Sequence, residues 1–327
     1  MSIKKVIDAL KHYKSFLITT HTNMEGDALG SELALYYLLQ NLNKKAMIVD
    51  DDVIPYGYDF LPLIDRIQRF SCKRKIEPFE CLCVVDCSDI SRTGQIQSIF
   101  SSTKEIINID HHISNSCFGT INYVDSQASC CCELIWRIYK TAKVKLDYTS
   151  AILLYTGILT DTGSFRYTNT NEKTHKIVAE LLSFGINPTQ VYQQVYGRIP
   201  LGDMKILIKI LPTMRTFYNG KLVTFEIRRL VFPHHYKVSV DLTEYVLSFG
   251  RGLQGAEVVV LFKENLSESS QIRVNFRSQG RIDVNHIAQF FGGGGHTTAS
   301  GATILGSLSS VKKRVIRYLG RFLKKVN

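Results

Sequence analysis

The sequence lacks any apolar stretch long enough to cross a membrane and lacks the biased segments that mark fibrous or disordered chains. A membrane-spanning helix needs a run of about 18 or more apolar residues, and the 327 residues contain none. Residues 1–16 form an amphipathic, lysine-containing stretch without the apolar centre of a secretory signal. There is also no internal repeat and no low-complexity linker. We therefore expect a globular, cytoplasmic protein with no membrane partner.

Cysteine is absent from the last 195 residues, since all eight cysteines precede residue 133. They are Cys72, Cys81, Cys83, Cys87, Cys117, Cys130, Cys131 and Cys132. No Cys-x-x-Cys pair is followed by a second pair at zinc-finger spacing. The sequence predicts reduced cysteines that are buried as small hydrophobic side chains. A metal site made of Cys81, Cys83 and Cys87 is the alternative.

Acidic residues are scarce in the C-terminal part of the chain. Residues 1–197 contain 20 Lys and Arg against 21 Asp and Glu, which gives a charge of −1. Residues 198–327 contain 20 Lys and Arg against 8 Asp and Glu, which gives +12 of the net charge of +11. This asymmetry suits a protein that binds a polyanion in one domain and holds metal ions in the other. A solvated basic surface is the alternative.

Apolar runs and helical periodicity alternate in the first half of the chain. Buried strands are expected at 16–20, 45–50, 82–86 and 106–109, and helices after Asp27 and at 130–141 and 149–160. Strands that alternate with helices predict an α/β fold with a doubly wound parallel sheet. The acidic triplet at 50–52 is expected to be a solvated turn, because no histidine accompanies it.

The pattern changes after Gly185, where Pro188 and Pro200 interrupt the chain. We expect one domain at 1–188, a linker region with a helix at 189–215, and a smaller α/β domain with a mixed sheet at 216–327. Its strands are predicted at 221–227, 256–262 and 271–276, followed by a helix at 283–291 and a basic amphipathic helix over the last seventeen residues. With 45% hydrophobic residues, the chain can form two separate cores. His234 and His235 are expected in a surface loop.

Acids and imidazoles follow the predicted strands of the first domain. Open α/β sheets hold their sites at the carboxyl ends of the strands. Three segments supply side chains after predicted strands, namely His21, Glu25 and Asp27; Asp86; and Asp110, His111 and His112, and Asp161 stands at the end of a predicted helix. Each acid also has a structural explanation, since Asp27 and Asp86 suit helix N-termini and Asp161 suits a turn. The agreement of four segments favours one common site.

Mixed carboxylate and imidazole ligands suit Mn²⁺ or a similar ion better than structural zinc. Two such ions about 3.5–4 Å apart can activate a water and stabilise an in-line displacement at phosphorus. Phosphoester hydrolysis is therefore the reaction that this set of residues supports best.

The chain resembles the DHH phosphoesterase superfamily and, within it, the nanoRNase/pAp phosphatase branch with a DHH-associated C-terminal domain. The matching segments are His21 to Ser31, Asp86 with Arg92 and Gly94, Asp110-His111-His112, Asp161-Thr162-Gly163, Arg277-Ser278, and Gly292 to His296. They occur in the family's order and cover nearly the whole chain.

The resemblance implies two metal ions, most commonly Mn²⁺, and assigns their ligands. One ion is expected on His21, Glu25 and Asp86, and the second on Asp27, Asp86, His111 and Asp161, so that Asp86 bridges them. The resemblance implies further that Asp110 orients His111, that His112 faces the phosphate or the leaving oxygen, and that Arg92 belongs to the catalytic set.

Two positions depart from the family's first motif, which usually reads His-x-Asn-Pro-Asp-Gly-Asp. Here Met24 and Glu25 replace the Pro-Asp pair. The additional methylene of Glu25 displaces its carboxylate by about a bond length, which is comparable to a coordination distance of about 2 Å. We expect an altered first metal site.

In similar proteins the C-terminal domain binds the terminal phosphate and sugar of the substrate. Carried over by position, Arg277, Ser278 and His296 contact the substrate, and Gly293, Gly294 and Gly295 offer backbone donors. Arg277 has the fork geometry that matches phosphate.

The resemblance implies an enzyme that hydrolyses very short RNA to 5′-mononucleotides and removes the 3′-phosphate of pAp. A hydrolase of linear or cyclic di-adenylate and a nucleotide-binding module weakened by Glu25 are the alternatives, and a homodimer stays open.

Overall fold

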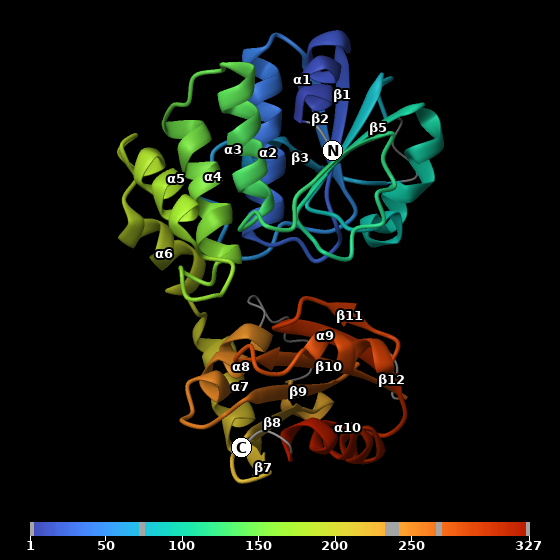
Figure 1. The fold of residues 1–327 in the computed structure, drawn as a ribbon, viewed down its shortest axis with the longest axis vertical. Coiled ribbons are helices and arrows are strands. Elements are labelled where there is room, and N and C mark those ends of the chain that lie inside the picture. The colour runs from blue at the N-terminus through green and yellow to red at the C-terminus, as the bar shows by residue number, and fades with distance from the viewer. Residues whose placement is uncertain (1–2, 72–75, 233–241, 266–269, 325–327) are drawn as a thin grey trace. The chain divides into compact units, whose positions relative to one another are not determined.

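The computed structural model describes residues 3–71, 76–232, 242–265 and 270–324. Two compact units are present, Met1–Arg198 (unit 1) and Ile199–Asn327 (unit 2), and each has its own sheet (Figure 1). Within the described ranges, no helix has both the length and the apolar composition that crossing a bilayer requires. Cys72, His234 and His235 lie outside the described residues.

The sheet of unit 1 has six parallel strands in the order β3-β2-β1-β4-β5-β6. Their bounds are β1 Ser15–Thr19, β2 Lys45–Asp50, β3 Ile67–Arg69, β4 Cys81–Val85, β5 Glu105–Asp110 and β6 Ile121–Val124. The chain runs outward from β1 to β3 and then returns to run outward from β4 to β6. The predicted doubly wound parallel sheet is therefore confirmed, and its strand order reverses between β1 and β4.

Both faces of this sheet are covered. Six helices build the larger core on one face: α1 Ile3–His12, α2 Gly26–Asn41, α3 Cys131–Ala142, α4 Tyr148–Asp161, α5 Glu172–Leu182 and α6 Pro188–Tyr196. The 3₁₀ segment η2 (Ile90–Ser102) covers the other face with Ile96 and Phe100, and the short η1 (Ile64–Arg66) precedes β3. A sheet buried on both faces explains why its strands are continuous apolar runs without alternation.

Helices α2, α3 and α4 pack closely around Gly157. A Cβ atom at this position would lie 2.2 Å from Sγ of Cys132 and 2.8 Å from Oδ1 of Asp27. Only glycine permits this approach, because interiors are close-packed and real Cβ atoms do not come so near. The tight packing brings α4, whose last residue is Asp161, close to Asp27.

The prediction for the cysteines is confirmed for six of the seven that are described. Cys81, Cys83, Cys87, Cys130, Cys131 and Cys132 are free and buried, as expected of small hydrophobic side chains. Cys117 is exposed, so for this residue the prediction was wrong. Among the described residues, the groups with metal-ligand spacing contain no cysteine.

Unit 2 has a six-stranded mixed sheet in the order β11-β12-β10-β9-β8-β7. The strands are β7 Arg215–Phe217, β8 Leu222–Ile227, β9 Val258–Glu264, β10 Gln271–Ser278, β11 Gly294–Gly295 and β12 Ala299–Leu305. Strands β8 and β9 are parallel and the other neighbours are antiparallel. The mixed sheet agrees with the sequence-based expectation.

Helices cover both faces of the second sheet as well. One core contains α7 (Leu201–Ile210) and α8 (Leu242–Arg251), and the other contains α9 (Val284–Phe290) and α10 (Leu308–Leu323). The short η3 (Leu211–Thr213) follows α7, and η4 (Arg229–Val231) follows β8. The predicted C-terminal amphipathic helix is α10, which buries Val311, Val315, Leu319 and Leu323.

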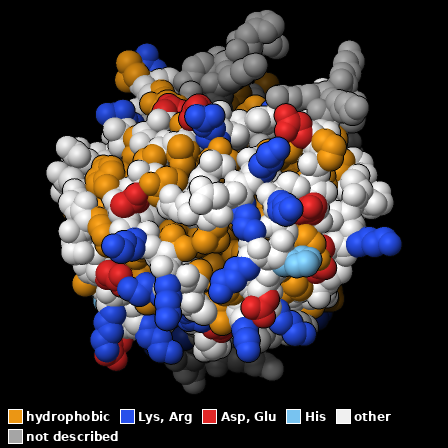
Figure 2. All heavy atoms as spheres, turned by 90° about the horizontal axis from the view of Figure 1, so that it is seen from above, with side chains coloured by type: hydrophobic (Ala, Val, Ile, Leu, Met, Phe, Trp, Pro, Cys, Tyr) orange, Lys and Arg blue, Asp and Glu red, His pale blue; other side chains and the backbone are white. Residues whose placement is uncertain are grey.

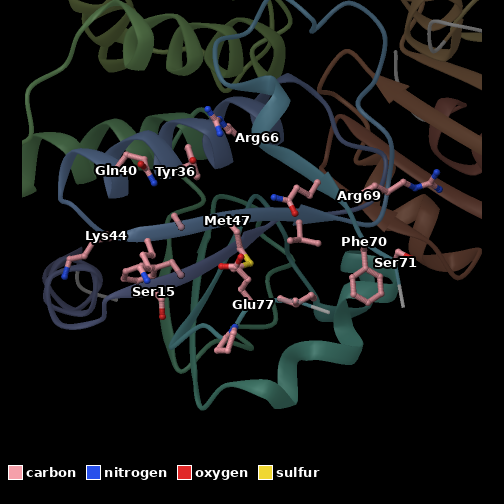
Figure 3. Close-up of a pocket in the computed structure, with 17 residues that line it drawn as sticks. Ser15, Tyr36, Gln40, Lys44, Met47, Arg66, Arg69, Phe70, Ser71 and Glu77 are labelled. Carbon is pink, nitrogen blue, oxygen red and sulfur yellow. The ribbon is translucent and has the colours of Figure 1, made fainter. Parts of the chain in front are cut away.

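A cavity of about 550 Å³ lies beside β2 in unit 1 (Figure 3). Strand β3 pairs with Ile48 to Asp50, the second half of β2. Met47, Arg69, Phe70 and Glu77 are among the lining residues, and none of the residues predicted for the site lines it.

Charged side chains are distributed unevenly. Figure 2 shows one face of the molecule, on which Lys and Arg side chains are spread between hydrophobic and acidic ones. Helix α10 differs, since it carries five Lys and Arg residues and no Asp or Glu.

Candidate metal centre

Three neighbouring parallel strands deliver the predicted side chains to one edge of the sheet in unit 1. Strands β1, β4 and β5 are adjacent. His21 follows β1 by two residues, Asp86 directly follows β4, and Asp110 is the last residue of β5. Because the carboxyl ends of parallel strands lie at the same edge, residues almost ninety positions apart meet there.

Asp86 lies between three imidazoles. Its Oδ2 is 3.5 Å from Nε2 of His21, and its Oδ1 is 3.6 Å from Nε2 of His111 and 3.7 Å from Nδ1 of His112. The side chain is buried, and Oδ1 has no hydrogen-bond partner within the described structure. Asp86 also has a φ of 52°, a left-handed conformation that non-glycine residues rarely adopt. Such strain occurs preferentially at functional sites.

His111 faces three carboxylates. Its Nε2 lies 3.6 Å from Oδ1 of Asp86, 3.6 Å from Oδ2 of Asp161 and 4.0 Å from Oδ2 of Asp27. Asp27, Asp86 and His111 are all buried, and their ligand atoms lie within 4.8 Å of one another. Together with Asp161, these are the residues that the family resemblance assigns to the second metal ion, and that assignment stays a prediction.

The carboxylate of Asp27 caps a helix distant in sequence. Its Oδ2 accepts a hydrogen bond of 2.6 Å from the backbone N–H of Cys131, and its Oδ1 accepts one of 2.8 Å from Cys132. These are the first two residues of α3, whose N–H groups have no partner inside the helix. The sequence offered a cap for α2 as the structural explanation of Asp27; the structure shows instead that it caps α3.

Burial and mutual charge perturb the ionisable groups of this cluster. Burial, reinforced by the nearby Asp27, raises the pKa of Asp86 well above its usual range, and burial raises the pKa of Asp161 to about 7. Burial alone would lower the pKa of His111, but Asp161, Asp86 and Asp27 raise it to about 9. The site therefore brings several carboxylates together in a buried region, and it favours a bound cation.

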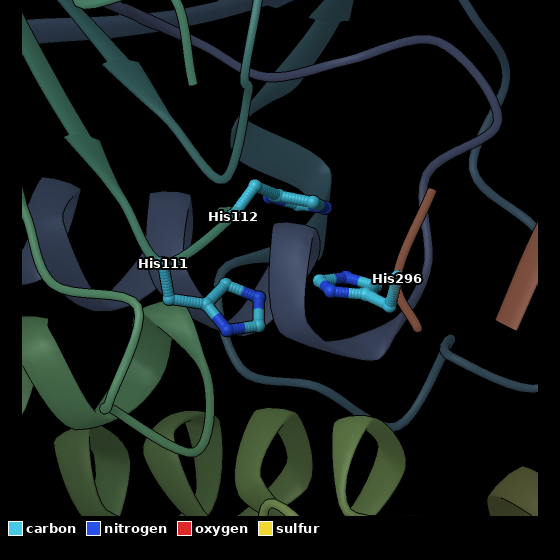
Figure 4. Close-up of side chains that lie close together, drawn as sticks. All are labelled: His111, His112 and His296. Carbon is cyan, nitrogen blue, oxygen red and sulfur yellow. The ribbon is translucent and has the colours of Figure 1, made fainter. Parts of the chain in front are cut away.

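The two histidines have different partners. They follow one another along the chain, and their rings are tilted by 57° with centroids 4.8 Å apart (Figure 4). Oδ1 of Asp110 lies 2.7 Å from Nδ1 of His112. Oδ2 of Asp110 accepts a hydrogen bond of 2.6 Å from Asn115. The sequence assigned Asp110 to the orientation of His111, and the hydrogen bond corrects this to His112. The physical reason is that side chains two residues apart on an extended segment share a side.

This environment also controls the charge of Asp110. Burial would raise its pKa, but the hydrogen bond and the charge of His112, together with Asn115, lower it below the usual range. Asp110 is therefore an ionised acceptor that fixes the ring of His112.

His21 and Glu25 differ in burial. Nδ1 of His21 donates to the carbonyl of Thr22 at 2.7 Å, which leaves Nε2 directed at Asp86 with a free electron pair. Burial lowers the pKa of His21, and Arg92 contributes to this effect. Glu25 is exposed at the N-cap of α2, and its side chain makes no capping hydrogen bond. The expectation that Glu25 alters the first metal site stays a prediction.

Three supporting residues were missed by the sequence analysis. Asn115 holds Asp110, and Asn169 contacts Oδ2 of Asp161 at 3.3 Å. Asp50 is buried, and its Oδ1 accepts from the side chain of Thr19 and the backbone N–H of Thr20, just before His21. The prediction of a solvated turn was wrong for Asp50. Its position at a strand end, like that of Asp86, was the signal that could have found it.

The residues present fit a divalent cation. Buried carboxylates and imidazole nitrogens converge, and Oδ1 of Asp86 is a buried acceptor for which the described residues offer no donor. An oxygen and nitrogen ligand set of this kind matches Mn²⁺, Mg²⁺ or a related ion. Arg92 lies beside the cluster, where its carbonyl accepts from the N–H of Thr22 and its Nη1 donates to Ser88 at 3.3 Å.

Unit 2 gathers its predicted residues at one end of its sheet. Arg277 on β10 pairs in register with Ala299 on β12, and β12 also pairs with the glycine strand β11. Arg277 forms an ion pair with Glu244, and buried Ser278 accepts from the N–H of Gly280 at 3.0 Å.

The backbone of the glycine run is partly occupied. The N–H of Gly293 donates to the carbonyl of Ala288 at 2.8 Å and so completes the end of α9. This corrects the prediction that Gly293 is a donor for the substrate. Gly293 serves instead for close packing, because a Cβ there would lie 2.1 Å from the carbonyl oxygen of Gly301. The donors expected of Gly294, Gly295 and His296 stay predictions.

Comparison with known proteins agrees with this arrangement. The family model described as "DHH family, N-terminal domain" matches residues 15–158, and the model "DHHA1 domain" matches residues 230–325. The bifunctional oligoribonuclease and PAP phosphatase NrnA of Thermus thermophilus is 31% identical over 301 residues, which are 91% of this chain and 87% of that protein. The chain belongs to the DHH family. The resemblance noted from the motifs is thereby confirmed.

Solved structures support the fold of this DHH protein. An exopolyphosphatase-related protein from Bacteroides fragilis has a TM-score of 0.88 at 22% identity, covering 99% of this chain and 97% of its own. RecJ from Thermus thermophilus, solved in complex with Mn²⁺, has a TM-score of 0.56 at 12% identity, covering 99% of this chain and 55% of its own. At these identities the similarity concerns the fold.

Proposed function

We propose that this DHH protein is a metal-dependent phosphoesterase that hydrolyses RNA of two to four nucleotides to 5′-mononucleotides and converts pAp to AMP. The observation that carries the proposal is the position of Asp86, a buried carboxylate that faces His21, His111 and His112 and retains an oxygen without a hydrogen-bond partner among the described residues. The relative from Thermus thermophilus, named as an oligoribonuclease and PAP phosphatase, supports the choice of substrate.

Two divalent ions, Mn²⁺ by analogy with the manganese-bound RecJ, would occupy the cluster. His21, Glu25 and Asp86 would hold one ion, and Asp27, Asp86, His111 and Asp161 would hold the other. When bound, such ions supply a water of lowered pKa and neutralise charge on the phosphate.

The remaining groups of the cluster would donate a proton and supply positive charge to the substrate. Asp110 holds Nδ1 of His112, so Nε2 of that ring is the atom that can give a proton to the leaving oxygen. Arg92, beside Ser88, adds a positive charge near His21.

The basic unit 2 would bind the anionic substrate. Arg277, Ser278 and His296 would contact its phosphate and sugar, as the family resemblance implies. Arg277 must exchange its partner Glu244 for phosphate, which a bidentate guanidinium favours.

A substrate panel tests the proposal. A dinucleotide, a tetranucleotide, a twenty-nucleotide RNA, pAp and linear and cyclic di-adenylate are incubated with Mn²⁺, Mg²⁺ or Co²⁺, and products are separated by length. We expect turnover of the dinucleotide and of pAp and much slower loss of the twenty-nucleotide RNA.

The Asp86→Asn variant is the control for the site, because it keeps the size of the side chain and removes its charge. Equal turnover by this variant would overturn the proposal. Saturable binding of the dinucleotide without any product would identify a binding module instead. Exclusive cleavage of di-adenylates would identify the other hydrolase.

A further inference from the structure

A column of stacked aromatic side chains lies on the surface of unit 2, between α9 and α10. The ring of Phe290 stacks on the ring of Tyr318 with centroids 3.9 Å apart and planes at 10°. The guanidinium of Arg321 lies over the same Tyr318 ring, 5.3 Å from its centroid. Phe291 and Phe322 support Tyr318 edge-on, with centroids 5.5 Å away in each case. The supporting rings fix the plane of Tyr318, and the stack ends in Phe290.

Phe290 is exposed although it is large and apolar. Its side chain is 60% accessible, although one face of the ring stacks on Tyr318 and the ring of Phe291 lies perpendicular to it with centroids 5.0 Å apart. An exposed ring held in a fixed plane offers a stacking partner for another flat ring at little cost in conformational entropy. Nucleobases use such rings in single-stranded nucleic acids.

The same surface carries positive charge from a helix without acidic residues. Helix α10 contains Lys312, Lys313, Arg314, Arg317 and Arg321 and no acid. Arg314 and Arg321 are exposed and lie one helical turn to either side of Tyr318. A polyanion would gain from these charges, and guanidinium groups both pair with phosphate and stack on rings.

We infer that the α9–α10 face, defined by Phe290, Tyr318, Arg314 and Arg321, is a binding surface for single-stranded RNA that lies outside the catalytic residues. A base stacks on the free face of Phe290, and phosphates pair with Arg314 and Arg321. The choice of RNA rests on the proposed function.

The α9–α10 face lies close in sequence to the residues expected to contact the substrate. Phe290 is followed, two residues later, by the glycine run that closes α9 through Gly292 and Gly293. This run is the segment expected to contact the substrate. An RNA strand longer than the substrate would thus be held next to the residues that receive its end, and would bind more tightly than a dinucleotide without being cut faster.

The test measures binding and catalysis in the same full-length variants. Fluorescence anisotropy of a labelled twelve-nucleotide oligoadenylate is recorded in EDTA, so that no cleavage occurs, and dinucleotide hydrolysis is recorded with Mn²⁺. The variants are Phe290→Ala and the double variant Arg314→Gln with Arg321→Gln. The matched control is Phe249→Ala, which removes another exposed phenylalanine of unit 2, 53% accessible on α8.

We expect Phe290→Ala to bind the RNA about ten-fold more weakly and Phe249→Ala to bind like the wild type, with dinucleotide hydrolysis unchanged in both. The double arginine variant should lower the slope of log affinity against log salt by about 1.4. If neither the wild type nor any variant hydrolyses the dinucleotide, while RNA binding still depends on Phe290, the proposed function is refuted and the inference about the α9–α10 face is retained.

Three results would overturn the inference. The first is equal RNA affinity of wild type and Phe290→Ala. The second is no RNA binding by the wild type together with Phe290-dependent binding to vesicles of phosphatidylglycerol and phosphatidylcholine, which would identify a membrane surface. The third is conversion of a dimer to a monomer by Phe290→Ala in sedimentation, which would identify a contact between copies of the chain.

Discussion

Oδ2 of Asp27 accepts a hydrogen bond from the backbone N–H of Cys131, a residue 104 positions later in the chain at the amino end of α3. The same oxygen lies 4.0 Å from Nε2 of His111. One carboxylate therefore joins α2 to α3 and also contributes to the candidate metal centre. The fold near the site and the charge of the site depend on the same side chain, and the two roles are separable by experiment.

The Asp27→Ala variant should be less stable than the wild type by about 1–2 kcal/mol even in EDTA, because two N–H groups of α3 lose their acceptor. Urea unfolding followed by circular dichroism measures this, and hydrolysis should be lost as well. Asp147→Ala is the matched control, since Asp147 caps α4 through Ser150 away from the predicted ligands. It should lose similar stability and keep its activity; a stable Asp27→Ala protein would contradict the capping role.

The Glu25→Asp variant should turn over a dinucleotide faster than the wild type when Mn²⁺ is limiting. The shorter side chain restores the residue that the family motif usually has, and Glu25 is exposed, so the exchange should not disturb the fold. The measurement is the initial rate as a function of Mn²⁺ concentration. Glu25→Gln, which retains the length and removes the charge, should be slower than both. An unchanged rate curve for Glu25→Asp would show that Glu25 is not a ligand that limits the first metal site.

The Asp110→Asn variant should lower kcat by about 10- to 100-fold and change metal affinity much less, because Asp110 fixes the ring of His112 and not that of His111. Steady-state kinetics and calorimetric titration with Mn²⁺ separate the two effects. His112→Asn should have a similar kcat, and combining the substitutions should add little. If Asp110→Asn lost metal affinity as strongly as activity, the orientation of His111 would be its role after all.

Without metal, stability should fall as pH rises from about 4 to about 9. The pKa of Asp161 is raised to about 7 by burial, so the folded state holds a proton that the unfolded state has already lost. The pKa of His111 is raised to about 9, so the stabilisation by its protonated ring is complete below the unfolded value of about 6.5 and disappears toward pH 9. Melting temperatures in EDTA across this range test both steps.

Added Mn²⁺ should reverse this trend, because the ion replaces the protons as the positive charge of the cluster. His111→Asn should reduce the part of the decline between about pH 7 and about pH 9, which belongs to the ring of His111. A decline of the same size in that variant would show that another group causes it.

Much of the fold was predictable from local patterns. The apolar runs at β1, β4 and β5 reflect the cover on both faces of the sheet, and each run is followed by polar residues that mark the end of the strand. The short strands β3, β7 and β11 were not predicted, and neither were β6 and β12. Asn122 in β6 and Gly301 in β12 interrupt their apolar character, and their strand conformation depends on pairing with β5 and β10.

The site was predictable as a set of residue types and not as a set of contacts. Asp86 and His111 stand at strand ends and Asp161 stands at a helix end, and these positions favoured one common site for the three residues. Asp50 shares the position but was assigned to solvent, because its two acidic neighbours suggested an exposed turn. Asp50 is buried and accepts hydrogen bonds from Thr19, at the end of the adjacent strand β1, and from Thr20, which follows it, and periodicity cannot show these contacts.

The sequence by itself determined the parallel sheet, the edge at which the site lies and the chemical nature of the ligands, because periodicity and strand-end residues are local properties of the chain. Only the tertiary structure decided that Asp27 caps α3 and that Asp110 holds His112. The first contact requires α2, α3 and α4 to pack closely at Gly157, and the second depends on the ring of His112 reaching back to Asp110, the last residue of β5. Contacts of this kind arise from packing between distant segments, which no local pattern encodes.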